Sequence, residues 1–222
     1  MQVIDEVSDL LQSHVNRDKV ASLTSYILKL WGTTSKSETL LAANARFVGA
    51  RATMRLFDDA AAIKAIAAYG LGKSDGCFWG SLGIANGIFS LTYLQFEKVI
   101  WLIDVGVLKV SKEVDFGART GHKLFWSLMA FVGFIRSLRA LNHAARVLNS
   151  PQKPRCAGAR YTQATLTSSK FLLDVIHVVS YLPRGWLWGG RLPAQHAAAA
   201  ATASAVLALL IHYKGKRLTS SR

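Results

Sequence analysis

Residues 70–74, Gly-Leu-Gly-Lys-Ser, resemble the end of a phosphate-binding loop. In such a loop the glycines leave backbone N–H groups free to hold phosphates, and the lysine pairs with their charge. The first glycine of the motif would fall at position 67, which is Ala67, and no strand is predicted before it. The segment therefore indicates a turn between two helices, and we do not expect nucleotide binding.

The sequence also gives little indication of a metal site or of a catalytic nucleophile. The six histidines, at positions 14, 122, 143, 177, 196 and 212, do not have the spacing of metal ligands. No Gly-x-Ser-x-Gly or Cys-x-x-Cys motif occurs. The two cysteines, Cys77 and Cys156, fit a reducing compartment without a disulfide framework. We therefore expect no catalytic residue, no metal, no cofactor and no enzymatic activity.

Residues 46–69 indicate a different chemistry, attachment to a charged lipid surface. A single helix is predicted from Ser37 through Ala68, and its apolar residues fall within one stripe. Basic side chains lie outside that stripe, where their stems can reach lipid phosphates. The candidate membrane-binding residues are Arg46, Phe47, Arg51, Met54, Arg55, Phe57 and Lys64, and the stripe also holds Ala50, Ala61, Ala65 and Ala68. The alternative is an ordinary bundle helix without lipid contact.

The elements around this helix must hold it at a membrane. Residues 77–96 contain no charge and are long enough to span a bilayer, ending near Phe96. Gly80, Gly83 and Gly87 would let another helix approach closely, which predicts helix packing or self-association. The alternative is that glycines are simply common in membrane helices. Before residue 37 we expect two short helices within 2–31, the second capped by Asn16, and a loop at 32–37.

Three further apolar stretches follow, at residues 124–141, 171–182 and 194–213. They predict an all-α integral membrane protein with N-terminal amphipathic helices and two to four membrane-embedded helices. The expected regions are a cytosolic amphipathic region (1–76), membrane helices (77–141), a basic cytosolic linker (142–170), a C-terminal membrane region (171–213) and a basic tail (214–222).

The charge is concentrated in one half of the chain. The net charge is +14, and all of this excess lies in residues 116–222, where Asp174 is the one acidic residue. Apolar runs alternate with this charge, which favours an anionic membrane face over nucleic acid as the partner. Because basic segments stay in the cytosol, the linker and the tail should both face it.

Four charged residues within or beside apolar stretches leave a second function open. Asp104, Asp174, Arg136 and Arg139 could line a pore, which would make the protein a non-selective metabolite channel. For Asp174 the alternative is an interfacial position.

Several short segments resemble one protein family in order and spacing. They are residues 51–58 (Arg-Ala-Thr-Met-Arg-Leu-Phe-Asp), 69–73 (Tyr-Gly-Leu-Gly-Lys), 97–104 (Glu-Lys-Val-Ile-Trp-Leu-Ile-Asp), 173–175 (Leu-Asp-Val) and 180–183 (Ser-Tyr-Leu-Pro). Together they resemble the peroxisomal biogenesis factor 11 (peroxin-11) family, in particular its gamma-type branch. The alanine-rich residues 197–201 depart from the family pattern and put the packing of the last span in doubt.

The resemblance implies a multi-pass peroxisomal membrane protein with both termini in the cytosol. It implies elongation of the membrane before fission, and hence peroxisome proliferation, through an amphipathic helix at residues 46–69. It also implies binding to anionic phospholipids, self-association into a homo-oligomer and contact with the peroxisomal fission machinery.

Overall fold

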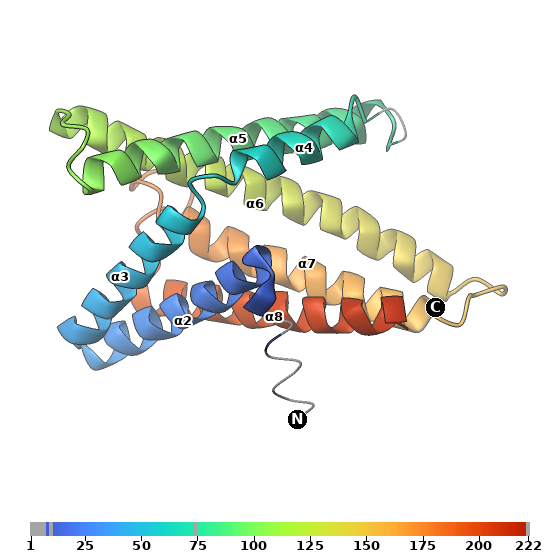
Figure 1. Ribbon diagram of the computed structural model, residues 1–222. Coiled ribbons are helices and arrows are strands. Elements are labelled where there is room, and N and C mark those ends of the chain that lie inside the picture. Colours follow the sequence, from blue (N-terminus) through green and yellow to red (C-terminus); the bar gives the residue numbers. More distant parts are fainter. Residues whose placement is uncertain (1–7, 9–10, 73–74, 221–222) are drawn as a thin grey trace.

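The computed structural model describes residue 8 and residues 11–72 and 75–220, and in them the chain forms seven α-helices and no strand (Figure 1). The prediction of an all-α fold is therefore confirmed. The helices are α2 (His14–Ser35), α3 (Glu38–Met54), α4 (Asp59–Tyr69), α5 (Cys77–Asp104), α6 (Lys112–Leu148), α7 (Ala157–Val179) and α8 (Ala194–Ser220).

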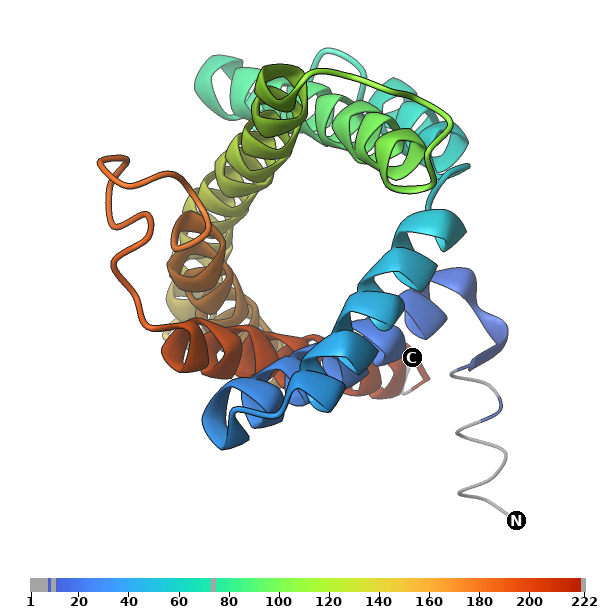
Figure 2. The ribbon, with the colours of Figure 1, turned by 90° about the vertical axis from the view of Figure 1, so that its left-hand side faces the viewer.

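The long helices alternate in direction and surround a common axis. Each of α5, α6, α7 and α8 packs against the next, as short connections favour for antiparallel neighbours. The α2–α3 hairpin contacts α8 through α2, and α4 lies along α5. Figure 2, viewed along this axis, shows the helices arranged as a ring. Residues 37–69 thus pass from one side of the ring to the other.

The N-terminal region differs from the prediction in two places. The first predicted helix lies largely on residues 1–7 and 9–10, outside the described residues. Helix α2 begins after Ser13 instead of Asn16, and Asn16 is buried with its amide 3.4 Å from Nε2 of His212. The predicted loop at 32–37 is also mostly helix, because α2 continues to Ser35 and ends at Lys36, which has a φ of 54°.

Gly32 is inside α2 because α3 packs closely against it. A Cβ at Gly32 would lie 3.0 Å from Cδ2 of Leu41 and 3.2 Å from Cβ of Leu40. Glycine was interpreted as a helix breaker from the sequence, yet here its missing side chain admits the neighbouring helix. The turn after it is short, and the hydroxyl of Ser37 accepts a hydrogen bond from the N–H of Leu40 at the start of α3.

Two other element boundaries differ from the predicted ones. Helix α5 does not end near Phe96 but continues to Asp104, because Glu97 and Lys98 find partners on the α3–α4 segment. The basic stretch 142–170 is mostly helical, since α6 extends to Leu148 and α7 begins at Ala157. The connection that was expected to be a long linker is therefore residues 149–156.

Small residues bring α7 and α8 together. Ala197, Ala198 and Ala201 on α8 are almost fully buried, so the alanine-rich run is a packing surface. A second cluster lies between α6 and α7. It consists of Ala130, Val175, Val179 and Leu182, with Leu124, Phe131, Phe134 and Trp188 packed against it.

Among the described residues, two helices are long and apolar enough to cross a membrane, α6 and α8. In each, few residues of the apolar window are buried inside the chain, 22% in α6 and 28% in α8, and most of the others are partly exposed. The predicted span at 77–96 lies in α5, which is not one of these two helices. Its polar residues Asn86, Thr92 and Gln95 reduce its hydropathy.

Candidate membrane-binding site

The helix predicted from Ser37 to Ala68 is broken in the middle. Helix α3 ends at Met54 and α4 begins at Asp59, with residues 55–58 forming a turn between them. In this turn the N–H groups of Leu56 and Asp58 bond the carbonyls of Thr53 and Arg55, three residues back. The prediction of one continuous helix is therefore wrong, although both halves are helical.

The apolar stripe on this segment is largely exposed in the part of the chain that the structure describes. Six of its seven residues are exposed, and Met54 is half-buried. Phe47 is 39% exposed and Phe57, at the turn, is 86% exposed. Arg46 and Lys64 are exposed as well. These residues can reach a lipid surface without any rearrangement of their own contacts.

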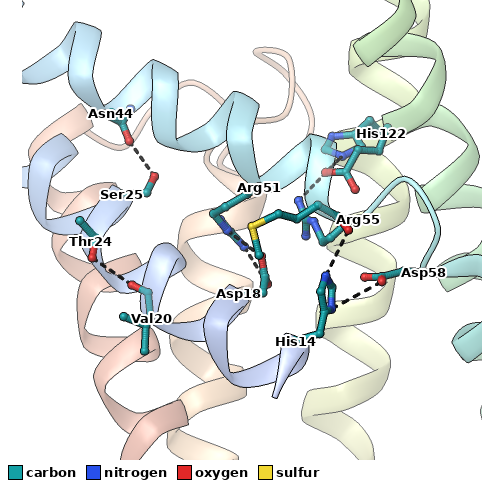
Figure 3. A network of polar contacts seen from close by, with 12 residues as sticks. His14, Asp18, Val20, Thr24, Ser25, Asn44, Arg51, Arg55, Asp58 and His122 are labelled. Carbon is teal, nitrogen blue, oxygen red and sulfur yellow. Dashed lines mark hydrogen bonds and ion pairs between the residues drawn. The ribbon is translucent and has the colours of Figure 1, made fainter. Parts of the chain in front are cut away.

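Arg51, in contrast, points into the protein. Its Nε and Nη2 donate to the two carboxylate oxygens of Asp18 on α2, at 2.9 and 3.2 Å (Figure 3). The two side chains are only 11% and 22% exposed. Such a two-pronged arrangement is the strong form of an arginine–carboxylate contact. The prediction that Arg51 reaches toward lipid phosphates does not describe this conformation.

The charge of Arg51 also changes the acidity of its partner. Burial alone would raise the pKa of Asp18, but the hydrogen bonds and positive charge of Arg51 outweigh burial and hold the pKa below its ordinary value. Arg55 and His14 add to this effect. Asp18 is therefore a carboxylate at neutral pH, and its ion pair with Arg51 is fully formed.

Arg55 also points inward, toward α5. Its Nη2 pairs with Oε1 of Glu97, a buried carboxylate that is 8% exposed. The guanidinium also lies 5.9 Å from the centre of the Tyr93 ring. The imidazole of His122 on α6 lies 4.0 Å from the same Glu97 oxygen and stacks on Tyr93. Arg55 thus ties the turn to the interior of the ring.

Further contacts hold the segment on both sides of the turn. His14 donates from Nε2 to the carbonyl of Met54 at 3.1 Å, and its Nδ1 lies 3.8 Å from Asp58 (Figure 3). After the turn, Asp59 pairs with Lys98 of α5.

Before the turn, the indole of Trp101 on α5 donates to the Thr53 hydroxyl at 2.9 Å. Together these residues place the turn between α2 and α5.

The sequence reasoning missed this network, although one signal was present. Glu97 and Lys98 interrupt an apolar run, and a charged pair in such a place requires partners. Those partners, Arg55 and Asp59, lie 42 and 39 residues earlier in the chain. Without the fold, nothing connects the two segments.

Two of the three glycines of α5, Gly83 and Gly87, face α4 of the same chain, and Gly80 faces the α4–α5 connection. A Cβ at Gly83 would lie 2.3 Å from Cζ of Tyr69, and one at Gly87 would lie 2.7 Å from Cγ1 of Ile66. Gly80 contacts the backbone of Gly72. These glycines therefore pack helices within one chain, and their role in self-association stays a prediction.

The four residues considered for a pore do not meet. Asp104 bonds Arg119, and Arg136 and Arg139 both lie near Asp75, at 3.5 and 3.6 Å. Asp174 is paired with Lys170 at 2.5 Å and accepts a hydrogen bond from Ser204. Their partners are in three separate places, and the channel function stays a prediction to be tested by conductance of the purified protein in planar bilayers.

Metal binding has no geometric basis in the part of the chain that the structure describes, where no three His, Cys, Asp or Glu side chains come together. The buried histidines make aromatic contacts instead. The rings of Trp126 and His177 lie edge to face at 5.4 Å, and His177 contacts Tyr26 and Tyr181 in the same way.

Known proteins are similar to most of this chain. A sequence model of the family described as peroxisomal biogenesis factor 11 (PEX11) matches residues 4–211. Peroxisomal membrane protein 11C of Mus musculus is 29% identical over 213 residues, which cover 87% of each chain. Peroxisomal membrane protein 11C of Homo sapiens is 27% identical over 229 residues, covering 94% of each chain. No solved structure matches the chain.

Proposed function

The chain belongs to the peroxisomal biogenesis factor 11 family, and on that premise we propose that it remodels the peroxisomal membrane through the exposed face of α3 and α4. The observation that carries this proposal is the uncovered apolar stripe, which is flanked by the exposed cations Arg46 and Lys64. Insertion of such a face into one leaflet expands that leaflet and favours curvature, which elongates the membrane before fission.

The membrane itself is the expected partner. The matched relatives are peroxisomal membrane proteins by name, and α6 and α8 have the length and composition of spanning helices. Residues 116–222 carry the whole net positive charge, which suits the anionic phospholipids of a cytosolic leaflet. We therefore place the protein in the peroxisomal membrane, with several crossings and with both termini and residues 149–156 in the cytosol.

Self-association and contact with the fission machinery are part of the same proposal. Because α4 and the α4–α5 connection cover Gly80, Gly83 and Gly87 within the chain, a homo-oligomer would use another surface in this conformation. The lipid-facing sides of α6 and α8 are available for it.

Reconstitution of the full-length protein into anionic liposomes tests the proposal, with the fraction of tubulated vesicles counted by electron microscopy. The variant Phe47→Ser/Phe57→Ser removes the largest exposed apolar side chains of α3 and the turn. We expect it to reduce tubulation several-fold. The matched control is Val107→Ser in the α5–α6 connection, which is 72% exposed and should leave tubulation unchanged.

A second pair of variants tests the charges. Arg46→Glu/Lys64→Glu reverses the two exposed cations and should reduce tubulation most strongly at low salt. Arg51 and Arg55 are left unchanged because they are ion-paired inside the protein. Lys109→Glu, an exposed cation outside α3 and α4, is the control. Equal tubulation by both variants and their controls would overturn the proposed function.

A further inference from the structure

We propose that three ion pairs around the α3–α4 turn form a latch, which keeps residues 38–69 bent until an anionic surface releases them into one continuous helix. The latch consists of Asp18–Arg51, Arg55–Glu97 and Asp59–Lys98. The lipid trigger rests on the proposed function. The bend and its cause rest on contacts within the chain.

The break in the helix has no strong local cause. Bends in helices are normally explained by proline, by glycine, or by an inserted side chain or water. Residues 55–58 are Arg-Leu-Phe-Asp, and no glycine or proline occurs between Gly49 and Gly70. The alanines on either side have the strongest helix propensity of all residues. Asp58 is a residue type favoured at the start of a helix, but its side chain makes no capping hydrogen bond here. The main cause of the bend is therefore tertiary.

The latch supplies that cause. Arg51 lies before the turn and is held by α2, whereas Asp59 lies after it and is held by α5. Arg55 lies at the turn itself and is held by Glu97 inside the ring. Helix α3 packs on α2, and helix α4 packs on α5. The two helices point in different directions (Figure 1). A straight, rigid helix cannot stay on both supports, so straightening requires at least one of the pairs to break.

A straight helix would join the two halves of the apolar stripe, which the bend separates. In the bent form the stripe is divided between two helices, and Phe57 is 86% exposed at the turn. In a continuous helix, Phe57 would be in line with Met54 and Ala61, three and four residues away on the same face. The turn would also regain hydrogen bonds to carbonyls four residues back. The acyl chains of the lipid would cover the joined stripe and remove its apolar surface from water.

Anionic lipid would also replace the partners that the arginines lose. Phosphate groups bind guanidinium groups in the same two-pronged manner as carboxylates. Asp18 and Glu97 hold Arg51 and Arg55 in the bent form, and lipid phosphates would hold them in the straight form. An anionic membrane surface, which also attracts the arginines by its net charge, therefore competes directly with the latch. Phosphatidylcholine carries a phosphate as well, but its choline cancels that charge, so a neutral membrane should compete far less.

The distance across the turn tests this inference without reference to membrane shape. Spin labels are attached at Ala45→Cys and Ala67→Cys, two exposed positions on α3 and α4, in a background with Cys77→Ser and Cys156→Ser. In a continuous helix these positions are 22 residues apart, or about 33 Å along the axis. We expect a shorter distance in neutral phosphatidylcholine vesicles, and a shift to about 33 Å when phosphatidylglycerol is included.

The variant Asp18→Asn/Glu97→Gln weakens the latch and keeps both arginines. It should show the long distance already in phosphatidylcholine vesicles. The control, Asp115→Asn, removes an ion pair within α6 and should leave the short distance unchanged. If the parent protein keeps one distance in both lipids, the latch is overturned whether or not the variant folds.

The two proposals can fail separately. A distance that lengthens on anionic vesicles that keep their shape would support the latch and overturn the remodelling function. Tubulated vesicles with an unchanged short distance would support the function and overturn the latch.

Discussion

At the scale of single residues, Asp18 and Arg51 form the best-defined polar contact between α2 and α3. Asp18→Asn should lower the free energy of unfolding at pH 7 by about 1–2 kcal/mol, because a largely buried guanidinium loses its charged partner. Urea denaturation in detergent micelles, followed by circular dichroism, measures this loss. A double-mutant cycle with Arg51→Gln measures the coupling energy between the two side chains. A value near zero would contradict a stabilising contribution of this ion pair.

The same pair predicts a pH dependence. The pKa of Asp18 is lower in the folded protein than its ordinary value of 3.8, so the folded state binds the proton less tightly than the unfolded state. The stabilisation is therefore complete above the ordinary value and is lost as the pH falls through the folded pKa. The difference between Asp18→Asn and the parent should be constant from pH 5 to 7 and should shrink below about pH 4.

Gly83 gives a second residue-scale prediction. Gly83→Ala places a Cβ 2.3 Å from the Tyr69 ring, so it should displace α4 and cost about 1–3 kcal/mol by overpacking. Gly117→Ala is the matched control, because nothing lies within 4 Å of its added Cβ. It should be neutral or stabilise α6 by up to about 1 kcal/mol. Thermal melts of both variants make the comparison, and equal melting temperatures would contradict the α4–α5 contact.

At the scale of elements, most helical segments are predicted from the sequence. The predictions fail where a contact with a residue far away in the chain determines the local structure. Apolar spacing predicts helix over residues 37–68, although as one helix where the structure has α3 and α4, and apolar runs locate parts of α5 to α8, because both signals are local. Neither signal predicts that Arg51 and Arg55 face carboxylates, since Asp18 is 33 and Glu97 is 42 residues away. Gly32 is missed for a related reason. Its role in α2 depends on the approach of Leu41, which no local rule describes.

The alanine-rich part of α8 is an element whose packing can be tested. Ala201 is fully buried, whereas Ala203, two residues away, is exposed. Ala201→Leu should therefore lower the stability by about 1–3 kcal/mol, because the larger side chain pushes the neighbouring helix away. Ala203→Leu should change stability little or improve partitioning into lipid. Equal loss in both variants would show that the buried face of α8 is different from the one described.

At the scale of the whole molecule, the charge distribution predicts topology. Basic residues concentrate at the end where α6 finishes and α7 begins, and again in the last turns of α8. Epitope tags at the N-terminus, within residues 149–156 and at the C-terminus should all be digested by protease added to intact peroxisomes. Protection of the middle tag alone would mean an odd number of crossings before residue 149, which would contradict the cytosolic assignment of this connection.

The alternating directions of α5 to α8 have a consequence for the two thiols. Cys77 begins α5, and Cys156 immediately precedes α7, and these two helices run the same way (Figure 1). Both sulfhydryls therefore lie at one end of the bundle. In sealed organelles, a maleimide that cannot cross lipid should modify both cysteines or neither. Intact-mass spectrometry should thus find two adducts or none, a stoichiometric readout of the sidedness that the fold imposes.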